Sequence, residues 1–242
     1  MTSIQTQPAV HLSNAEFRDA VLNLHPEVAV FDCDGTLWSV DAGYGFMIWS
    51  LERGLVSRNA SDWIDSRYRL YLAGDVSEAA MCGEMVQVYA GLQESEMRKA
   101  AALYFHEEIE AHIFPELRTL IAELRDTGTQ LWAVSSTNNW VIEEGVRELG
   151  IPAERILCAR VETADGVITS KLLDVPTDEG KAWSLVRAGV LTADAVFGNS
   201  IHDIPMLEIA THPFPVNPTP ALAQVAALKQ WPIYYPESLV RP

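Results

Sequence analysis

The chain has 242 residues, of which 48% are hydrophobic, enough for one large domain or a domain with a smaller insertion. Acidic residues number 33 and basic ones 17, and the resulting net charge of −16 argues against nucleic acid and anionic membranes as partners. The three cysteines (Cys33, Cys82, Cys158) lack zinc-site spacing, and their odd number favours reduced thiols. No apolar run approaches roughly 18 residues and no signal-peptide core is visible, so we expect a cytoplasmic protein.

Residues 1 to about 12 have the composition of a loose tail, and a helix is expected from Ser13 to Leu24. The apolar run that begins at Val28 predicts a buried parallel strand. No convincing strand follows between about 43 and 110. Glycines divide this part into four expected helices: Tyr44–Arg53, Ala60–Leu72, Val76–Ala90 and Glu94–Ala111.

Strands and helices alternate after Pro115. Expected helices are Glu116–Thr127, Asn138–Leu149 and Lys181–Ala188, and expected strands are Gln130–Ser135, Arg155–Ala159 and Ala195–Phe197. The Asp165-Gly166 pair predicts a hairpin within Val161–Leu173, and Thr211–Val216, which contains two prolines, fits an edge strand. This order predicts an α/β fold, a Rossmann-like parallel sheet flanked by helices. We expect a core domain of residues 1–42 and 112–242 and an inserted helical cap domain of residues 43–111.

Two aspartates, Asp32 and Asp34, end the first strand and are followed by Gly35 and Thr36. Chemistry in open α/β sheets is located at the carboxyl ends of the strands. Two neighbouring carboxylates repel unless a cation joins them, which indicates a metal site. A strand followed by a simple Asp-Gly turn is the alternative for this motif taken alone.

Three later segments carry polar or charged residues that could assist Asp32 and Asp34. Ser135-Ser136-Thr137-Asn138 ends a strand before a helix and could bind an anion, or could merely cap that helix. Lys181 opens a helix, where its charge opposes the helix dipole, and this favours another role over helix stabilisation. Lys171 in the hairpin is the weaker competitor. Asn199 and Asp203 follow another buried strand and offer oxygen ligands to a hard cation.

Together these residues resemble the four motifs of the haloacid dehalogenase superfamily. The motifs are Phe31 to Leu37, Val134 to Thr137, Lys181, and Gly198 to Leu207. The helical insertion after the first motif and the hairpin resemble the phosphoserine-phosphatase-like branch, subfamily IB.

The resemblance implies a Mg²⁺-dependent phosphatase that hydrolyses a small phosphomonoester metabolite through an aspartyl-phosphate. Asp32 would be the nucleophile, Asp34 the general acid and base, and Lys181 would neutralise the phosphoryl oxygens. The implied metal ligands are Asp32, the Asp34 backbone carbonyl, Asn199 and Asp203. The implied substrate-binding residues are Ser135, Ser136, Gly35, Asp41 and His202.

This sequence departs from that family at two places. Asn199 stands where most relatives have Asp, which should weaken Mg²⁺ binding. No arginine lies near Cys82–Glu84, where phosphoserine phosphatases hold the substrate carboxylate, so an amine-bearing or neutral phosphomonoester is favoured. Candidate pocket walls are Trp38, Tyr44, Phe46 and Trp49, although a core position suits each of them as well.

Two alternatives stay open. One is a phosphotransferase on the same scaffold, and the other is a catalytically weak phosphate-binding or regulatory protein, motivated by Asn199. The expected partner is a small phosphorylated metabolite, with no nucleic acid and no membrane, and the expected state is a monomer or homodimer.

Overall fold

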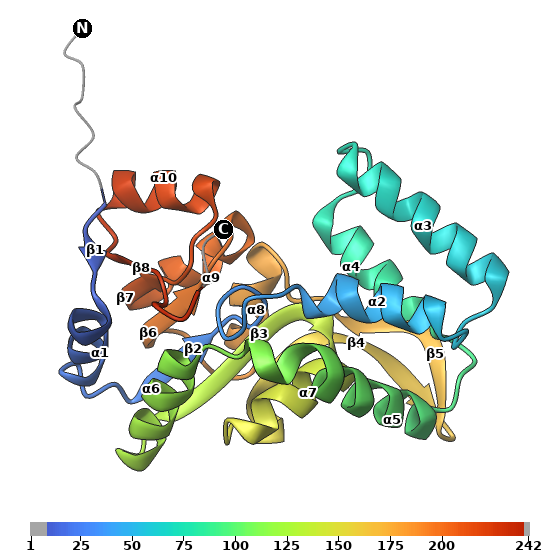
Figure 1. The fold of residues 1–242 in the computed structure, drawn as a ribbon, viewed down its shortest axis with the longest axis horizontal. Coiled ribbons are helices and arrows are strands. Elements are labelled where there is room, and N and C mark those ends of the chain that lie inside the picture. Colours follow the sequence, from blue (N-terminus) through green and yellow to red (C-terminus); the bar gives the residue numbers. More distant parts are fainter. Residues whose placement is uncertain (1–8, 240–242) are drawn as a thin grey trace, which may run out of the picture.

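A six-stranded sheet forms the centre of the molecule in the computed structural model, which describes residues 9–239 (Figure 1). The strand order is β5-β4-β3-β2-β6-β7, and every neighbouring pair is parallel except β4 and β5. The strands are β2 (Val28–Phe31), β3 (Gln130–Asn138), β4 (Ile156–Ala164), β5 (Val167–Asp174), β6 (Ala193–Gly198) and β7 (Ala210–Pro215). The predicted parallel α/β fold is confirmed.

The sheet is buried on both faces because alternate side chains of its central strands join two different apolar clusters. Ala29 and Phe31 of β2 pack with the helices of one face, while Val30 packs with those of the other. The first face is covered by α1 (Asn14–Leu22), α6 (Pro115–Asp126) and α7 (Asn139–Glu148). The second is covered by α8 (Glu179–Arg187), α9 (Ile204–Glu208) and α10 (Pro220–Lys229).

Between residues 43 and 110 the described chain contains helices and no strand, as predicted (Figure 1). The α-helices of this segment are α2 (Ala42–Glu52), α3 (Arg58–Leu72), α4 (Glu78–Gln87) and α5 (Glu94–Tyr104). The last expected helix ends earlier than predicted, since a π-helical turn (Phe105–Ile109) and a 3-10 turn (Glu110–His112) follow α5.

This helical segment shares its apolar core with the sheet. Phe46 of α2, Tyr89 after α4 and Tyr104 of α5 belong to the same cluster as Phe31 of β2. Met47, Ile64, Val76 and Met81 form a smaller cluster of their own. The division into separate core and cap domains at residues 43 and 111 therefore stays a prediction.

The β4–β5 hairpin turns at Asp165 and Gly166, which have φ of +48° and +80°, the left-handed conformation that such tight turns need. Its edge binds the segment between α4 and α5 through the backbone. Gly91 N–H donates to the Ile168 carbonyl (2.8 Å), and Ile168 N–H donates to the Leu92 carbonyl (2.9 Å). These hydrogen bonds thus attach the connection between α4 and α5 to the sheet.

The expectation of a loose N-terminal tail is wrong for its described part. His11–Leu12 forms β1, which pairs in parallel with β8 (Ile233–Tyr234), and Phe17 stacks on Tyr234 with ring centroids 4.0 Å apart. Residues 1–8 of that expected tail lie outside the described residues. The edge strand expected near Thr211–Val216 is present as β7.

Short helical turns complete the described chain at Ala153–Arg155 and Ile201–Asp203. Across residues 9–239, none of the helices combines the length and the apolar character needed to traverse a lipid bilayer.

Candidate active site

At the ends of three neighbouring strands, polar side chains lie along one edge of the sheet. Asp32 directly follows β2, Ser135 lies near the carboxyl end of β3, and Asn199 directly follows β6. Since β3, β2 and β6 are adjacent and parallel, their carboxyl ends meet at the same edge. All three residues line a cavity of about 520 Å³ between this edge and the helices α2, α3 and α4.

Two side chains bind the buried carboxylate of Asp32, one at each oxygen. Lys181 Nζ donates to its Oδ1 at 2.6 Å, and Thr36 Oγ1 donates to its Oδ2 at 2.8 Å. Burial, with the nearby charge of Asp203, raises the pKa of Asp32 to about 6, although Lys181 and Thr36 act in the opposite direction. The carboxylate is therefore fixed in orientation and placed at the cavity wall.

Lys181 is buried at the start of α8, where it contacts two carboxylates. Its Nζ lies 2.6 Å from Asp32 Oδ1 and 2.5 Å from Asp203 Oδ1. Burial alone would lower the pKa of Lys181, but these two charges outweigh it and raise the pKa. The turn that brings the lysine inward includes Asp178, a non-glycine residue at φ +49°. The competitor Lys171 is exposed in the hairpin and pairs there with Glu162.

Asp203 is fully buried, and both of its oxygens have partners. Oδ1 accepts from Lys181, while Oδ2 accepts from the backbone N–H groups of Asn199 (2.8 Å) and Ser200 (2.9 Å). These contacts differ from those of the metal ligand that the sequence suggested. They favour a positioning role, in which Asp203 orients Lys181 and the loop after β6.

The Asp34 side chain points away from Lys181, toward α2 and the end of β3. Its Oδ1 accepts from Trp38 Nε1 (2.6 Å) and from Ala42 N–H (3.1 Å), and its Oδ2 accepts from Thr137 Oγ1 (2.6 Å). Burial and then the charge of Asp41 raise the pKa of Asp34 to about 7, against the effect of the Thr137 and Trp38 hydrogen bonds. A carboxyl group of this kind can hold or release a proton near neutral pH.

Gly35 allows Asn199 to approach the loop after β2. A Cβ at residue 35 would lie 1.8 Å from Asn199 Nδ2, and the φ of Gly35 is +76°. Asn199 therefore packs against the same loop that carries Asp32 and Asp34. The Asp32 carboxylate, the Asp34 backbone carbonyl and the Asn199 side-chain oxygen are the metal ligands implied by the family resemblance, and oxygen ligands of this kind suit a hard divalent cation such as Mg²⁺.

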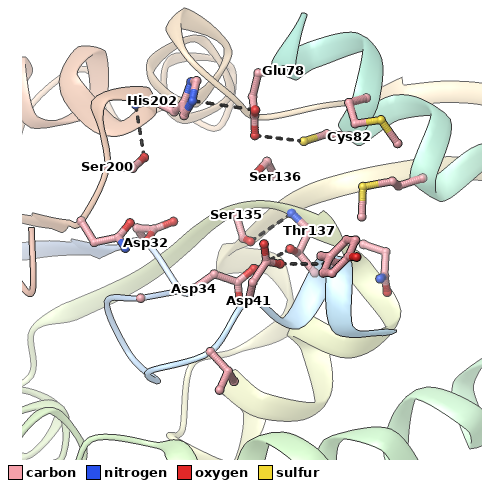
Figure 2. A pocket seen from close by; sticks show the side chains of 18 of the residues that line it. Asp32, Asp34, Asp41, Glu78, Cys82, Ser135, Ser136, Thr137, Ser200 and His202 are labelled. Atoms are coloured by element: carbon pink, nitrogen blue, oxygen red, sulfur yellow. Dashed lines mark hydrogen bonds and ion pairs between the residues drawn. The ribbon is translucent and has the colours of Figure 1, made fainter. Parts of the chain in front are cut away.

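The remaining predicted residues line the cavity at different depths. Ser135 is buried, and its Oγ accepts from Thr137 N–H at 3.1 Å. Ser136 lies beyond Ser135, below Glu78 and Cys82 of α4 (Figure 2). Both ring nitrogens of His202 face acidic side chains, since its Nδ1 pairs with Asp178 (2.7 Å) and its Nε2 lies 3.8 Å from Glu78.

Asp41 caps α2 and faces the cavity. Its Oδ1 accepts from Tyr44 N–H at 2.8 Å, and burial raises its pKa against the effect of that bond. Among the four aromatic candidates for the pocket wall, Tyr44 lines the cavity. Trp38, Phe46 and Trp49 are instead part of the apolar core.

Several residues of the site were not singled out by sequence reasoning. Thr36 and Thr137 stand inside the first and second motifs, so their hydroxyl groups were visible as candidates for binding Asp32 and Asp34. Trp38 was considered only as a wall, whereas its indole N–H binds Asp34. Glu78 gave no signal, because a glutamate at the start of a helix is common.

Two aspartates, Asp32 and Asp34, follow the carboxyl end of β2, and the buried Lys181 contacts the first of them. Such an arrangement is typical of an enzyme of phosphoryl transfer. The sequence profile of the haloacid dehalogenase-like hydrolases matches residues 29–208. The chain therefore belongs to the haloacid dehalogenase-like hydrolase family.

Curated relatives with phosphatase names support this membership. The chain is 27% identical over 217 residues to a histidinol-phosphatase of Neisseria meningitidis serogroup C, covering 85% of this chain and 97% of the relative. It is 27% identical over 201 residues to a phosphoserine phosphatase of Halobacterium salinarum, covering 81% and 88%. A substrate-bound phosphoserine phosphatase structure aligns with a TM-score of 0.59 at 16% identity, covering 87% of this chain and 93% of that one, which shows the fold.

These relatives and the family assignment make the chain a phosphomonoesterase, a hydrolase of phosphate monoesters. Phosphatases of this family generally use a divalent metal ion.

Proposed function

We propose that the protein is a Mg²⁺-dependent phosphatase of a small phosphorylated metabolite, and that it acts through a phosphorylated Asp32. The observation that carries this proposal is the buried Asp32 carboxylate, held between Lys181 and Thr36 at the floor of the cavity. Such a carboxylate is oriented in advance, which lowers the cost of reaching a geometry suited to attack.

In the first step an Asp32 oxygen attacks phosphorus, so that an Asp32–phosphorus bond forms as the bond to the leaving alcohol breaks. The leaving oxygen takes its proton from the Asp34 carboxyl group. In the second step the Asp34 carboxylate accepts a proton from water, whose oxygen attacks phosphorus and releases inorganic phosphate. Asp32 and Asp34 thus return to their initial states.

Positive charge must offset the repulsion between the Asp32 carboxylate and the phosphate. Lys181 supplies one charge, and Asp203 holds it in place. Asp32, the Asp34 carbonyl and Asn199 would hold Mg²⁺, which when bound supplies further charge stabilisation to the phosphoryl oxygens. Ser135 adds a hydroxyl donor on the side of β3.

The first test of this proposal uses p-nitrophenyl phosphate. We expect turnover with Mg²⁺, loss of turnover with EDTA, and loss in Asp32→Asn, since the amide is a poor nucleophile. Asp126→Asn, at the exposed end of α6, serves as the control and should retain activity. Robust activity in Asp32→Asn would contradict the proposed nucleophile.

A second test separates the role of Asp34 from that of Asp32. Loss of a general acid harms a poor leaving group more than a good one. Asp34→Asn should therefore lower kcat/KM, which reports the steps up to release of the alcohol, much more with an alkyl phosphate than with p-nitrophenyl phosphate. Equal losses with both substrates would argue against Asp34 as the general acid.

Hydrolysis is distinguished from transfer by measuring both products. Free phosphate should equal the released alcohol even when an acceptor alcohol is added. A shortfall of phosphate would instead identify a phosphotransferase. The names of the relatives make histidinol phosphate and phosphoserine the first metabolites to compare.

A further inference from the structure

The wall of the cavity formed by the helices after β2 is acidic and aromatic. Glu78 of α4 and Asp41 at the start of α2 line it, together with Tyr44, Tyr68 and Tyr71. Asp41 lies beside Asp34, and Glu78 lies on α4 above Ser136 (Figure 2), so both acids border the space that the alcohol part of a substrate would occupy. The chemistry of this wall therefore bears on which alcohol the enzyme accepts.

Glu78 has a buried oxygen without a well-formed hydrogen bond. Its side chain is 17% exposed, its Oε1 receives a weak bond from Cys82 Sγ at 3.4 Å, and its buried Oε2 has no partner of good hydrogen-bond geometry. The Tyr71 hydroxyl is near, since burial and then Glu78 raise the pKa of that tyrosine. The nearest basic atom described is His202 Nε2 at 3.8 Å, beyond hydrogen-bond distance. A buried carboxylate oxygen without a partner costs free energy unless a ligand supplies one. Figure 2 shows this carboxylate beside Cys82 and above Ser136.

Helix stabilisation does not account for this arrangement. Glu78 is in the first turn of α4, where a negative charge interacts favourably with the helix dipole even in solvent. Glu96 in the first turn of α5 has that simple role: it is 68% exposed and pairs with Lys99. Glu78 instead lines the cavity, with its side chain 17% exposed.

In the described part of the chain, the cavity contains no lysine or arginine that could neutralise these acids. Among the described residues that line it, Lys181 is the single lysine or arginine, and Asp32 and Asp203 already bind its ammonium group. The His202 ring lies 3.8 Å from Glu78 and pairs with Asp178. Asp41 and Glu78 therefore present negative charge to any bound alcohol. A substrate carboxylate at this end would be repelled, whereas a cation would be attracted.

The aromatic part of the wall favours the same charge. Tyr44 and Tyr68 stack with ring centroids 4.4 Å apart, and Tyr68 lies 5.8 Å from Tyr71. The faces of such rings attract ammonium and imidazolium groups.

We propose that this wall selects phosphomonoesters whose alcohol carries a positively charged nitrogen and no carboxylate, with Glu78 as a counter-ion that determines specificity. This inference rests on the proposed phosphatase function. Glu78 binds the charged nitrogen of the substrate and does not touch the phosphate.

The experiment compares two substrates of nearly equal shape. Phosphoethanolamine carries an ammonium group, and propyl phosphate has a methyl group in its place. The quantity measured is the ratio of kcat/KM for the charged substrate to that for the neutral one. We expect a ratio of at least about tenfold for the wild-type protein, because hydrogen bonds to charged groups are worth roughly 1.5–3 kcal/mol.

Three variants test whether Glu78 causes this preference. Glu78→Gln should lower the ratio about tenfold, mainly through KM for phosphoethanolamine, because the amide keeps the shape but loses the charge. Glu52→Gln, at the exposed end of α2 and outside the cavity, removes the same charge and should leave the ratio unchanged. Glu78→Lys should shift preference toward phosphoglycolate, which carries a carboxylate.

The outcomes distinguish a failure of this inference from a failure of the proposed phosphatase function. A wild-type ratio near one overturns the inference, even if the variants fail to fold, and so does an unchanged ratio in folded Glu78→Gln. Absence of Asp32-dependent hydrolysis of p-nitrophenyl phosphate would instead overturn the proposed function itself.

Discussion

Lys181 illustrates how single residues set the chemistry of this site. A buried ammonium group is costly unless it is paired, and here Asp32 and Asp203 pair with it from two sides. The position of Asp32, the proposed nucleophile, therefore depends on Asp203, a second carboxylate that does not line the cavity. The contribution of Asp203 is thus separable from that of Asp32.

Asp203→Asn should lower kcat by about a hundredfold, because Lys181 loses its second anchor and a small displacement of a reacting group is costly. Stability should fall by roughly 3 kcal/mol, since the variant breaks a buried charge pair. The measurements are steady-state kinetics and urea denaturation.

Asp194→Asn is the matched control for this variant. Asp194 Oδ2 also accepts two backbone N–H bonds, from Glu27 and Val28, but at the other end of the sheet. Its loss should reduce stability by roughly 1–3 kcal/mol while kcat stays near the wild-type value. An Asp203→Asn variant with normal kcat would contradict the positioning role.

Asn199→Asp should tighten Mg²⁺ binding by about tenfold, because a charged ligand replaces a neutral amide oxygen next to Asp32. The melting temperature of the variant without metal should fall through repulsion between the two carboxylates, and Mg²⁺ should raise it more than in the wild type. Thermal denaturation with and without Mg²⁺ measures both effects. Equal shifts in the two proteins would place Asn199 outside the metal site.

At the scale of elements, α7 packs so closely against the loop after β2 that the helix needs a glycine at the contact, Gly145. A Cβ at Gly145 would lie 2.7 Å from Phe105 Cε2 and 3.0 Å from Trp38 Cζ3. Trp38 in turn donates to Asp34, so this packing connects helix α7 with the proposed general acid.

Gly145→Ala should destabilise the protein by about 1–3 kcal/mol through overpacking. Gly83→Ala in α4 is the comparison, because its Cβ would meet chiefly the side chain of Leu172, which is 40% exposed and can move. Alanine there should be neutral or stabilising by up to about 1 kcal/mol, owing to its helix propensity. Urea denaturation of both variants provides the measurement, and equal losses would contradict the packing described for α7.

The elements of the sheet could be predicted because each motif combined an apolar run with a polar residue at its end. Asp32, Ser135 and Asn199 come together for that reason, since strand order fixes where their ends meet. The contacts of Asp203 and His202 could not be predicted, because the directions of side chains in a loop depend on tertiary packing. Glu78 was missed for the same reason, as its burial depends on how α4 packs against the strands.

At the scale of the whole molecule, one apolar cluster joins the helices that follow β2 to the sheet. Backbone hydrogen bonds from Gly91 and Ile168 fasten the same helices to the β4–β5 hairpin. The roof of the catalytic cavity is therefore built on the same core as its floor.

This shared core predicts a single cooperative unfolding transition. Tryptophan fluorescence and far-UV circular dichroism should give coincident curves in urea. Two separated transitions would show that the helical segment folds as an independent unit, and would support its description as a domain.

The most direct test of the central claim is to trap the phosphorylated enzyme. Rapid acid quenching during turnover, followed by peptide mass spectrometry, should find one phosphoryl group on the peptide that contains Asp32, and none in Asp32→Asn. Hydrolysis at a normal rate without any such labelled peptide, or a label on another residue, would contradict the account.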